Sequence, residues 1–157
     1  MIEPAKRAAI NDLMADYCHF IDDNRLEDWL GFFVEDCVYK ILSRENVDSN
    51  LPLELMLCSN KNMLRDRVLS LRQANIYNIH TDKHVLGVVR ILGEENGLYR
   101  VQANYTVYQT NQDGVSMLFS VGTYRDKIRF EGAEPRFVEK IVVADTFGIP
   151  RMLSTPL

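Results

Sequence analysis

The sequence lacks any apolar run near the roughly 20 residues that a membrane-spanning helix needs. Its first residues, MIEPAKRAAINDLM, carry charges where a signal peptide has an apolar core. Only three of its 157 residues are cysteines, Cys18, Cys37 and Cys58, and an odd, scattered set is no disulfide framework. We therefore expect a cytoplasmic protein, without a membrane segment, whose cysteines are reduced and partly buried thiols.

A surplus of basic residues is also missing. The formal net charge is −4, and acidic and basic residues are interleaved, as on a solvated surface. This balance argues against a nucleic-acid binder. The chain also has no Gly-rich phosphate-binding loop and no G-x-S-x-G motif. Its length suits one domain over residues 1–157, large enough to bury about two-thirds of its unfolded surface without a disulfide or metal.

Helical patterns occupy the first half of the chain. Apolar residues recur every three or four positions early on, and Pro4 stands where a helix start tolerates it. Asn24 and Glu27 have capping-box spacing and predict the start of a short second helix. A third helix is predicted over residues 60–74. The first apolar stripe consists of Ile10, Leu13, Met14, Tyr17, Phe20 and Ile21.

Strand patterns dominate the second half. Asn96-Gly97 and Asp113-Gly114 are typical of hairpin turns. Residues 43–53 are polar and predict a long loop, and the tail with Pro150 and Pro156 is expected to be irregular. The predicted strands are 37–41, then 84–92, which we expect to be buried on both faces, and then 99–110, 117–130 and 136–145.

One of these strands has an apolar face that changes side. Met117 and Phe119 have one parity, and Tyr124 and Ile128 have the other, so the set switches near Gly122. A bulge or sharp bend there explains the switch, because an offset of one residue turns every side chain to the other face. Helices followed by antiparallel strands predict an α+β fold, with a strongly bent sheet curled around the helices as an open cone.

Metal-ligand patterns are incomplete. His80 and His84 in HTDKH have the spacing of a helical zinc site, but Thr81 replaces the required glutamate and His84 leads into a strand. His80, Asp82 and His84 are the residue types of an iron facial triad, yet adjacent turn positions rarely converge on one ion. Cys18-His19 lacks the intervening residue and the second pair of a Rieske site. We predict no metal or cofactor site in this chain.

Acid–base chemistry is the stronger alternative for a site within the chain. A histidine held by an aspartate, with tyrosines binding a carbonyl group, supports proton abstraction or dehydration, as in small dehydratases of the scytalone dehydratase type. Tyrosines on apolar faces are more often core residues. The candidate pocket residues are Tyr17, Asp22, Tyr39, His80 and His84.

Several segments, in order and at matching spacing, resemble the small (β) subunits of aromatic-ring-hydroxylating dioxygenases. They span most of the chain, although none is a sharp motif by itself. The segments are LEDWLGFFVEDCVY (26–39), MLRDRVLSLRQANIY (63–77), HTDKHVLGVVRIL (80–92), FSVGTYRDKIRF (119–130) and FVEKIVVADTF (137–147).

This resemblance implies a cone-like α+β fold of the nuclear-transport-factor-2 (NTF2-like, cystatin-like) type. It also implies a large (α) subunit that holds a Rieske [2Fe-2S] cluster and a mononuclear Fe(II), commonly in an α3β3 assembly. Electrons would come from NAD(P)H through a reductase, sometimes with a ferredoxin. The small subunit would be mostly structural, with no catalytic residue of its own.

The segments RQANIY and HVLG and the ending MLSTPL resemble members acting on aromatic acids, as in terephthalate, salicylate and anthranilate systems. Lys140 is a departure, since many relatives have arginine before this aliphatic run, and we expect it to alter a subunit contact. An arginine-bearing helix (Arg65, Arg67 and Arg72) favours a partner-facing or solvated surface. Two alternatives stay open: a free-standing dehydratase or isomerase with an Asp–His pocket, and a binding module of the same fold.

Overall fold

The computed structural model of the chain describes residues 1–73, 79–145 and 155–157. The helices are α1 Pro4–Asp22, α2 Leu26–Trp29, α3 Arg44–Asp48 and α4 Lys61–Gln73, with a 3₁₀ turn, η1, at Leu30–Phe32. The strands are β1 Phe33–Ser43, β2 Glu54–Cys58, β3 His80–Leu86, β4 Arg90–Glu95, β5 Leu98–Asn111, β6 Ser116–Glu131 and β7 Glu134–Ala144.

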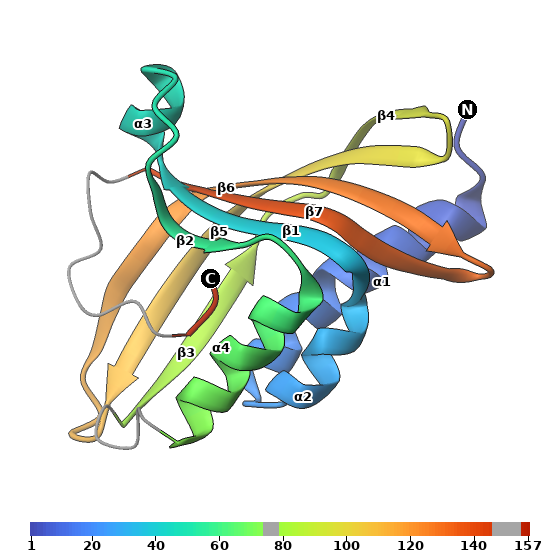
Figure 1. Cartoon of the computed structure of the whole chain (residues 1–157). Coiled ribbons are helices and arrows are strands. Elements are labelled where there is room, and N and C mark those ends of the chain that lie inside the picture. The colour runs from blue at the N-terminus through green and yellow to red at the C-terminus, as the bar shows by residue number, and fades with distance from the viewer. Residues whose placement is uncertain (74–78, 146–154) are drawn as a thin grey trace.

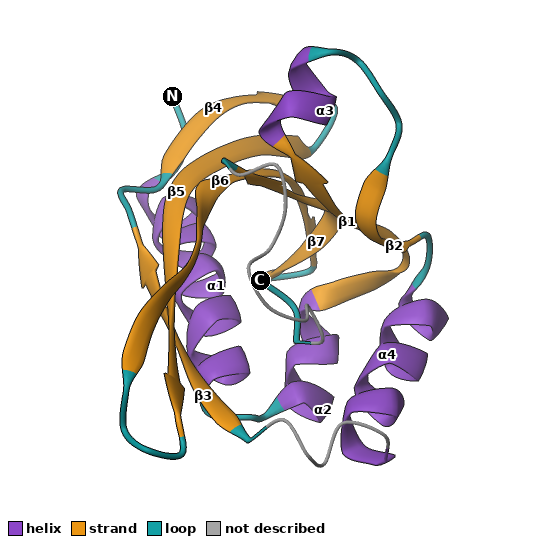
Figure 2. Ribbon diagram, turned by 90° about the vertical axis from the view of Figure 1, so that its left-hand side faces the viewer, coloured by secondary structure: helices purple, strands orange, loops and turns teal. Residues whose placement is uncertain are grey.

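These strands form one strongly curved sheet. Its order in the described residues is β2-β1-β7-β6-β5-β3, and β4 pairs with a further part of β5. Only β1 and β7 run parallel; the other neighbours are antiparallel. Helices α1, α2 and α4 lie on one side of the sheet (Figure 1), and the sheet curls around this side (Figure 2). The predicted α+β order and mainly antiparallel bent sheet are confirmed.

Helix α1 supplies the centre of the core. Pro4 stands in its first turn, where a missing N–H costs no hydrogen bond. Its apolar stripe faces the inward side chains of the strands, as the three-to-four-residue spacing predicts. The buried residues of α1 are Ile10, Leu13, Met14, Tyr17, Cys18 and Ile21. Phe20 of the predicted stripe is only partly buried, beside this core.

The face switch in β6 is real, but it lies at Phe119. Val107 of β5 pairs with Ser120, and Tyr108 pairs with Leu118, so Phe119 is an extra residue in the ladder. Phe119 and Ser120 are therefore both buried although they are consecutive. The switch thus precedes the predicted position at Gly122 by a few residues, and its cause is the predicted bulge.

Gly122 has a different role, which is to allow close contact with the neighbouring strands β5 and β7. A Cβ atom added to it would lie 2.0 Å from the Val143 carbonyl oxygen and 2.9 Å from Cε1 of Tyr105. No side chain fits in this space without a backbone shift.

The predicted hairpins are confirmed: Asn96 and Gly97 have φ values of 53° and 79°, as a tight turn requires.

Residues 43–58 are more ordered than predicted. The expected loop contains α3, whose first turn is capped because the Ser43 hydroxyl accepts a hydrogen bond from the Asn46 N–H. The next segment forms the unpredicted edge strand β2, in which Met56 and Cys58 face inward and Leu55 and Leu57 are exposed. Exposed leucines hid the strand's alternation, because they are apolar on the outer face as well.

The strand predicted over 84–92 is wrong in two respects. It consists of parts of β3 and β4, which pair with successive parts of β5 and are separated at Gly87–Val89. It is also not buried on both faces, because Val85 is 55% exposed and Val88 is 85% exposed. β3 is an edge strand of the sheet, and its outer face, which includes Val85, is in solvent.

The capping box predicted for the second helix is absent. Residue Arg25 precedes α2 without a side-chain cap, and Asn24 has a left-handed φ of 58°. The helical segment ends at Phe32, and β1 starts at Phe33, four residues before the strand predicted over 37–41. Ala74 of the third predicted helix and Pro150 of the tail lie outside the described residues.

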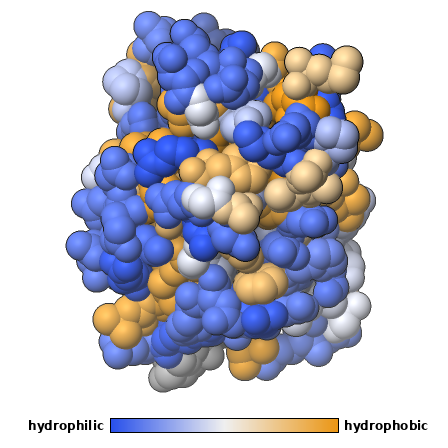
Figure 3. All heavy atoms as spheres, turned by 90° about the vertical axis from the view of Figure 1, so that its right-hand side faces the viewer, coloured by the Kyte–Doolittle hydropathy of each residue, from blue (hydrophilic) through white to orange (hydrophobic). Residues whose placement is uncertain are grey.

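The molecular surface is mixed. On the side where the β4–β5 and β6–β7 hairpins end, hydrophobic residues lie in small groups between hydrophilic ones (Figure 3). Among the described residues, no helix has both the length and the apolar character needed to span a bilayer.

We predict that Gly122→Ala lowers the free energy of unfolding by roughly 1–3 kcal/mol or more, because the new methyl group overlaps the Val143 carbonyl. Denaturant unfolding of the chain measures this loss. Gly31→Ala is the matched control, since its Cβ meets no atom within 4 Å. Equal stability of the two variants would contradict the close-contact role of Gly122.

Candidate functional site

Asp22 and His84 form the tightest polar contact between a helix and the sheet. The His84 Nδ1 atom lies 2.6 Å from Asp22 Oδ1, and the His84 backbone N–H donates to Oδ2 at 2.8 Å. The His84 side chain is fully buried and that of Asp22 is 4% exposed. The carboxylate thus binds the ring and the backbone of the same residue. Two of the predicted pocket residues are therefore in direct contact.

Local structure explains this pairing. Asp22 is the last residue of α1, and β3 is an edge strand, so one side of its backbone has no neighbouring strand. The carboxylate satisfies the His84 N–H on that open side and holds the helix end against the sheet. The other ring nitrogen, Nε2, is buried and has no hydrogen-bond partner among the described residues.

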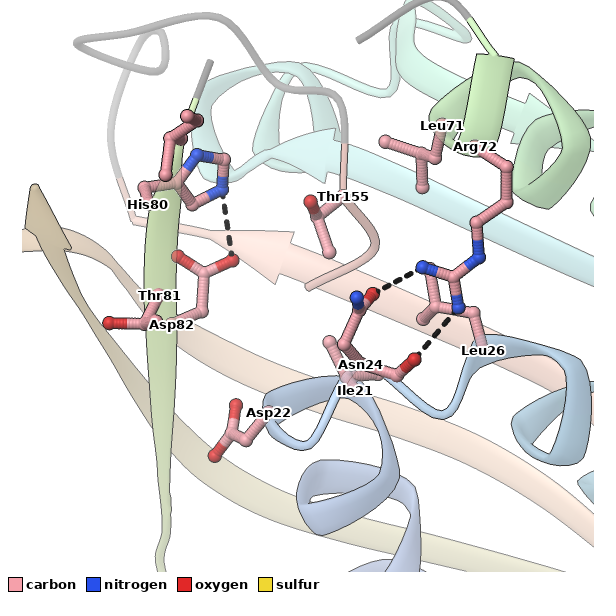
Figure 4. A pocket seen from close by; sticks show the side chains of 11 residues that line it. Ile21, Asp22, Asn24, Leu26, Leu71, Arg72, His80, Thr81, Asp82 and Thr155 are labelled. Carbon is pink, nitrogen blue, oxygen red and sulfur yellow. Dashed lines mark hydrogen bonds and ion pairs between the residues drawn. The ribbon is translucent and has the colours of Figure 1, made fainter. Parts of the chain in front are cut away.

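A polar pocket of about 270 Å³ opens beside this contact. Asp22, His80 and Asp82 contribute to its wall, and His80 Nε2 lies 3.6 Å from Asp82 Oδ2. His84 is not among the lining residues. Figure 4 shows the His80–Asp82 pair on β3 and, across the pocket, Arg72 bonded to Asn24.

The opposite wall is fixed by Arg72 of α4. Its guanidinium donates to both oxygens of the Glu27 carboxylate at 2.8 Å, and to the side chain and backbone oxygens of Asn24 at 2.7 Å. The hydrogen bonds from Arg72 lower the pKa of Glu27 to about 2. The predicted capping residues thus bind α4 instead of α2. The arginine's donors are used for helix contacts and not for a ligand.

Tyr17 and Tyr39 meet deep inside the cone, where their hydroxyl oxygens lie 3.3 Å apart. Both donate to the main-chain oxygen of Leu157, which lies 3.1 Å from the Tyr39 hydroxyl. The Leu157 N–H donates back to the Tyr39 hydroxyl at 3.0 Å. Leu157 is 1% exposed, so the last residue of the sequence occupies the space beside the two tyrosines. Burial raises the pKa of both phenols.

A charged pair also lies in this interior. Lys140 Nζ donates to Asp126 Oδ2 at 2.9 Å, and both side chains are 0% exposed. The ammonium group lies 3.6 Å from the centroid of the Tyr124 ring, 4.1 Å from Tyr17 and 4.8 Å from Phe137. The expectation that Lys140 alters a subunit contact is therefore wrong, because its side chain faces the core.

Burial has opposite effects on the two partners. It raises the pKa of Asp126 to about 6 and lowers that of Lys140, while their mutual attraction acts against both shifts. The raised pKa favours the folded state at low pH, and this contribution is lost as the pH rises from 3.8 to about 6. Asp126 Oδ1 has no hydrogen-bond partner in the described residues.

The five candidate residues do not converge on one reaction site. Asp22 and His80 line the same pocket, His84 binds Asp22 but is not part of that lining, and Tyr17 and Tyr39 surround Leu157. Sequence reasoning missed Lys140 and Asp126, the most deeply buried charges. The alternation of the strand could have identified Asp126, because it lies between Tyr124 and Ile128 on the apolar face of β6.

Among the described residues, no three His, Cys, Asp or Glu side chains are arranged to hold a metal ion. Cys18, Cys37 and Cys58 lie on α1, β1 and β2, and all three are buried free thiols. Burial raises the pKa of Cys18 to about 12 and that of Cys37 to about 11, so neither is a reactive thiolate. They were expected to be partly buried, and all three are fully buried.

Known proteins are similar to this chain in sequence and in fold. A family model described as "Ring hydroxylating beta subunit" matches residues 18–151. The anthranilate 1,2-dioxygenase small subunit of Burkholderia cepacia is 39% identical over 141 residues, which are 90% of this chain and 88% of that protein. Subunit beta 2 of the terephthalate 1,2-dioxygenase terminal oxygenase component from Comamonas sp. is 31% identical over the full length of both chains.

A solved structure gives the same result. A beta subunit assigned to an aromatic-ring-hydroxylating dioxygenase from Novosphingobium aromaticivorans superposes with a TM-score of 0.89. It is 39% identical and the match covers 99% of this chain and 100% of the other. The similarity confirms the predicted NTF2-like cone.

We predict that Lys140→Met lowers the free energy of unfolding by about 3–5 kcal/mol, because it leaves the Asp126 carboxylate buried without a partner. The double variant Asp126→Leu/Lys140→Met should regain most of this loss. Denaturant unfolding at pH 7 measures both.

The control is Lys127→Met, which breaks an exposed ion pair with Glu139 and should cost at most about 1 kcal/mol. If the double variant were as unstable as Lys140→Met, the loss would not come from the uncompensated carboxylate.

Proposed function

Because this chain belongs to the family of ring-hydroxylating dioxygenase beta subunits, we propose that it acts as a non-catalytic assembly subunit. In this role residues 1–157 form one domain that binds and stabilises a large subunit. The large subunit would hydroxylate an aromatic ring with O2 and electrons derived from NAD(P)H. The buried free cysteines support a cytoplasmic setting for the complex.

The pairing of the candidate polar groups with one another is the observation that supports a structural role. An enzyme of this shape needs a space between sheet and helices where substrate meets an acid or base. Here the main-chain oxygen of Leu157 is hydrogen-bonded to the Tyr17 and Tyr39 hydroxyls, and the Asp22 carboxylate is bound to His84. The free nitrogen of His84 is buried away from the pocket wall. We therefore assign no catalytic residue to this chain.

The iron groups implied by the family do not fit the residues described here. A Rieske cluster needs paired cysteines and histidines, but the three cysteines lie on different elements, and His80 and His84 each face an aspartate. A mononuclear Fe(II) needs an open site with two histidines and a carboxylate. We assign the Rieske [2Fe-2S] cluster and the Fe(II) to the large subunit, in an α3β3 complex supplied by a reductase, with or without a ferredoxin.

The substrate class that the relatives support is an aromatic carboxylic acid. The two curated relatives named above are subunits of dioxygenases acting on anthranilate and terephthalate. Both compounds carry a carboxylate on a benzene ring. We propose that the assembled oxygenase containing this chain takes a substrate of the same kind.

Co-expression with the large subunit tests this function. We expect a stable hetero-oligomer that contains iron, whereas the chain purified alone contains none, because its residues offer no ligand set. Size-exclusion chromatography and metal analysis measure both properties. A lone chain that is stable and converts a small carbonyl substrate, without binding the large subunit, would contradict the proposal.

The Asp22–His84 contact provides a second test. Asp22→Asn removes the carboxylate needed for acid–base work but keeps an oxygen that accepts from the His84 N–H. We expect turnover per assembled complex to stay within about twofold, whereas loss of a catalytic acid or base costs about 10²–10⁴-fold. Steady-state rates normalised to iron content measure it, and thermal unfolding reports any loss of folding separately. A hundredfold decrease in a correctly assembled complex would assign chemistry to this pair.

A further inference from the structure

The outer face of the sheet has no helix over its centre. Among the described residues, helices α1, α2 and α4 all lie on the inner side (Figure 1), and α3 contacts the sheet mainly at β1 and β7. Outward side chains of β4, β5, β6 and β7 therefore form a surface open to solvent. A sheet face left uncovered in a single chain is a natural contact surface for a partner.

This outer face is basic where the middle strands meet. In one cross-strand row Arg90 pairs with Gln102, and Gln102 pairs with Arg125. In the next row Arg100 pairs with Lys127, and Lys127 pairs with Glu139. We call Arg90, Arg100, Arg125 and Lys127 the basic patch; all four are exposed.

Most of this positive charge has no internal counter-ion. Lys127 binds Glu139 at 2.8 Å, but Arg90, Arg100 and Arg125 make no ion pair among the described residues. Like charges on neighbouring strands repel one another and weaken the pairing. The chain as a whole has a net charge of −4, so this concentration of cations opposes its overall balance. An acidic surface placed over the patch would relieve the repulsion.

An apolar groove runs through the patch. It has a volume of about 280 Å³. Its lining includes the apolar residues Leu92, Val101 and Ile141, the cations Arg100, Arg125 and Lys127, and the carboxylates Asp126 and Glu139. Leu92 is 44% exposed. Gly93 contributes to the shape, because a Cβ atom there would lie 3.1 Å from Nη2 of Arg100. The absence of that atom lets the guanidinium lie close to β4, beside the groove.

We propose that this face binds an acidic segment of the large subunit. Carboxylates of that segment bind the guanidinium groups of Arg100 and Arg125, and one of its apolar side chains lies in the groove at Leu92 and Ile141. The inference rests on the proposed function, which supplies the partner. The planar guanidinium fork favours paired contacts with carboxylates. A symmetric dimer of this chain through the same face would place the patch against its own copy, so charge complementarity favours the large subunit.

Charge reversal tests the surface in the full chain co-expressed with the large subunit. Arg100→Glu and Arg125→Glu should each raise the dissociation constant at least about tenfold, because a like charge faces the acidic segment. Arg7→Glu is the matched control: it makes the same change of charge at an exposed position on α1 and should stay within about twofold. Raising the ionic strength should weaken the wild-type complex and the control alike.

A footprint on the wild-type complex gives a readout that needs no variant. Phenylglyoxal modifies accessible arginines, and mass spectrometry locates the modified positions. Arg100 and Arg125 should be protected in the complex but not in the chain alone, whereas Arg7 should react in both. This measurement decides the question even where a charge-reversed chain fails to fold.

The outcomes separate the two proposals. A wild-type chain that does not bind the large subunit at any ionic strength overturns the proposed function. A complex in which Arg100→Glu and Arg125→Glu bind like Arg7→Glu, with both arginines unprotected, overturns only the docking surface. Self-association of the lone chain that these reversals abolish would make the face a contact between copies and would also overturn it.

Discussion

A buried ammonium group sets the requirements for the interior of this protein. Lys140 is removed from water, and a lone charge in such a place is very costly. The Asp126 carboxylate and the faces of Tyr124, Tyr17 and Phe137 surround it. These groups come from α1, β6 and β7, so the charge is stabilised only when helix and sheet are packed together. Its position couples the closure of the cone to the pairing of β6 with β7.

The same interior explains the division of labour between subunits. The aromatic residues that surround Lys140 also place the Tyr17 and Tyr39 hydroxyls where Leu157 binds them. The Asp22–His84 contact closes the other end of α1 against β3. Side chains and the last residue thus use the donors and acceptors that related cone-shaped enzymes would need for a substrate. A domain whose inner polar groups bind one another is suited to present its outer surface to a partner.

The sequence predicted residues better than it predicted their contacts. The Asp–His pairing was anticipated from types and order, but not that His84 would contribute its backbone N–H as well as its ring. Asn24 and Glu27 had the right spacing for a cap, yet Arg72, 45 positions beyond Glu27, binds both. The resemblance led us to expect Lys140 at a subunit contact, whereas its side chain is fully buried. The burial pattern of β7 shows that the Lys140 side chain shares the inward face with Val142.

Local patterns determined the helix-then-strand order, the apolar stripe of α1, the hairpin turns and the existence of a bulge in β6, because each depends on residues close together in the chain. The ordered resemblance also determined the family. Tertiary structure decided where the bulge lies, where β3 ends and β4 begins, and which polar groups inside the cone bind one another. Those features depend on contacts between residues as distant as Tyr39 and Leu157, which are 118 positions apart. No local spacing records such contacts, since they form only when the whole sheet curls around α1.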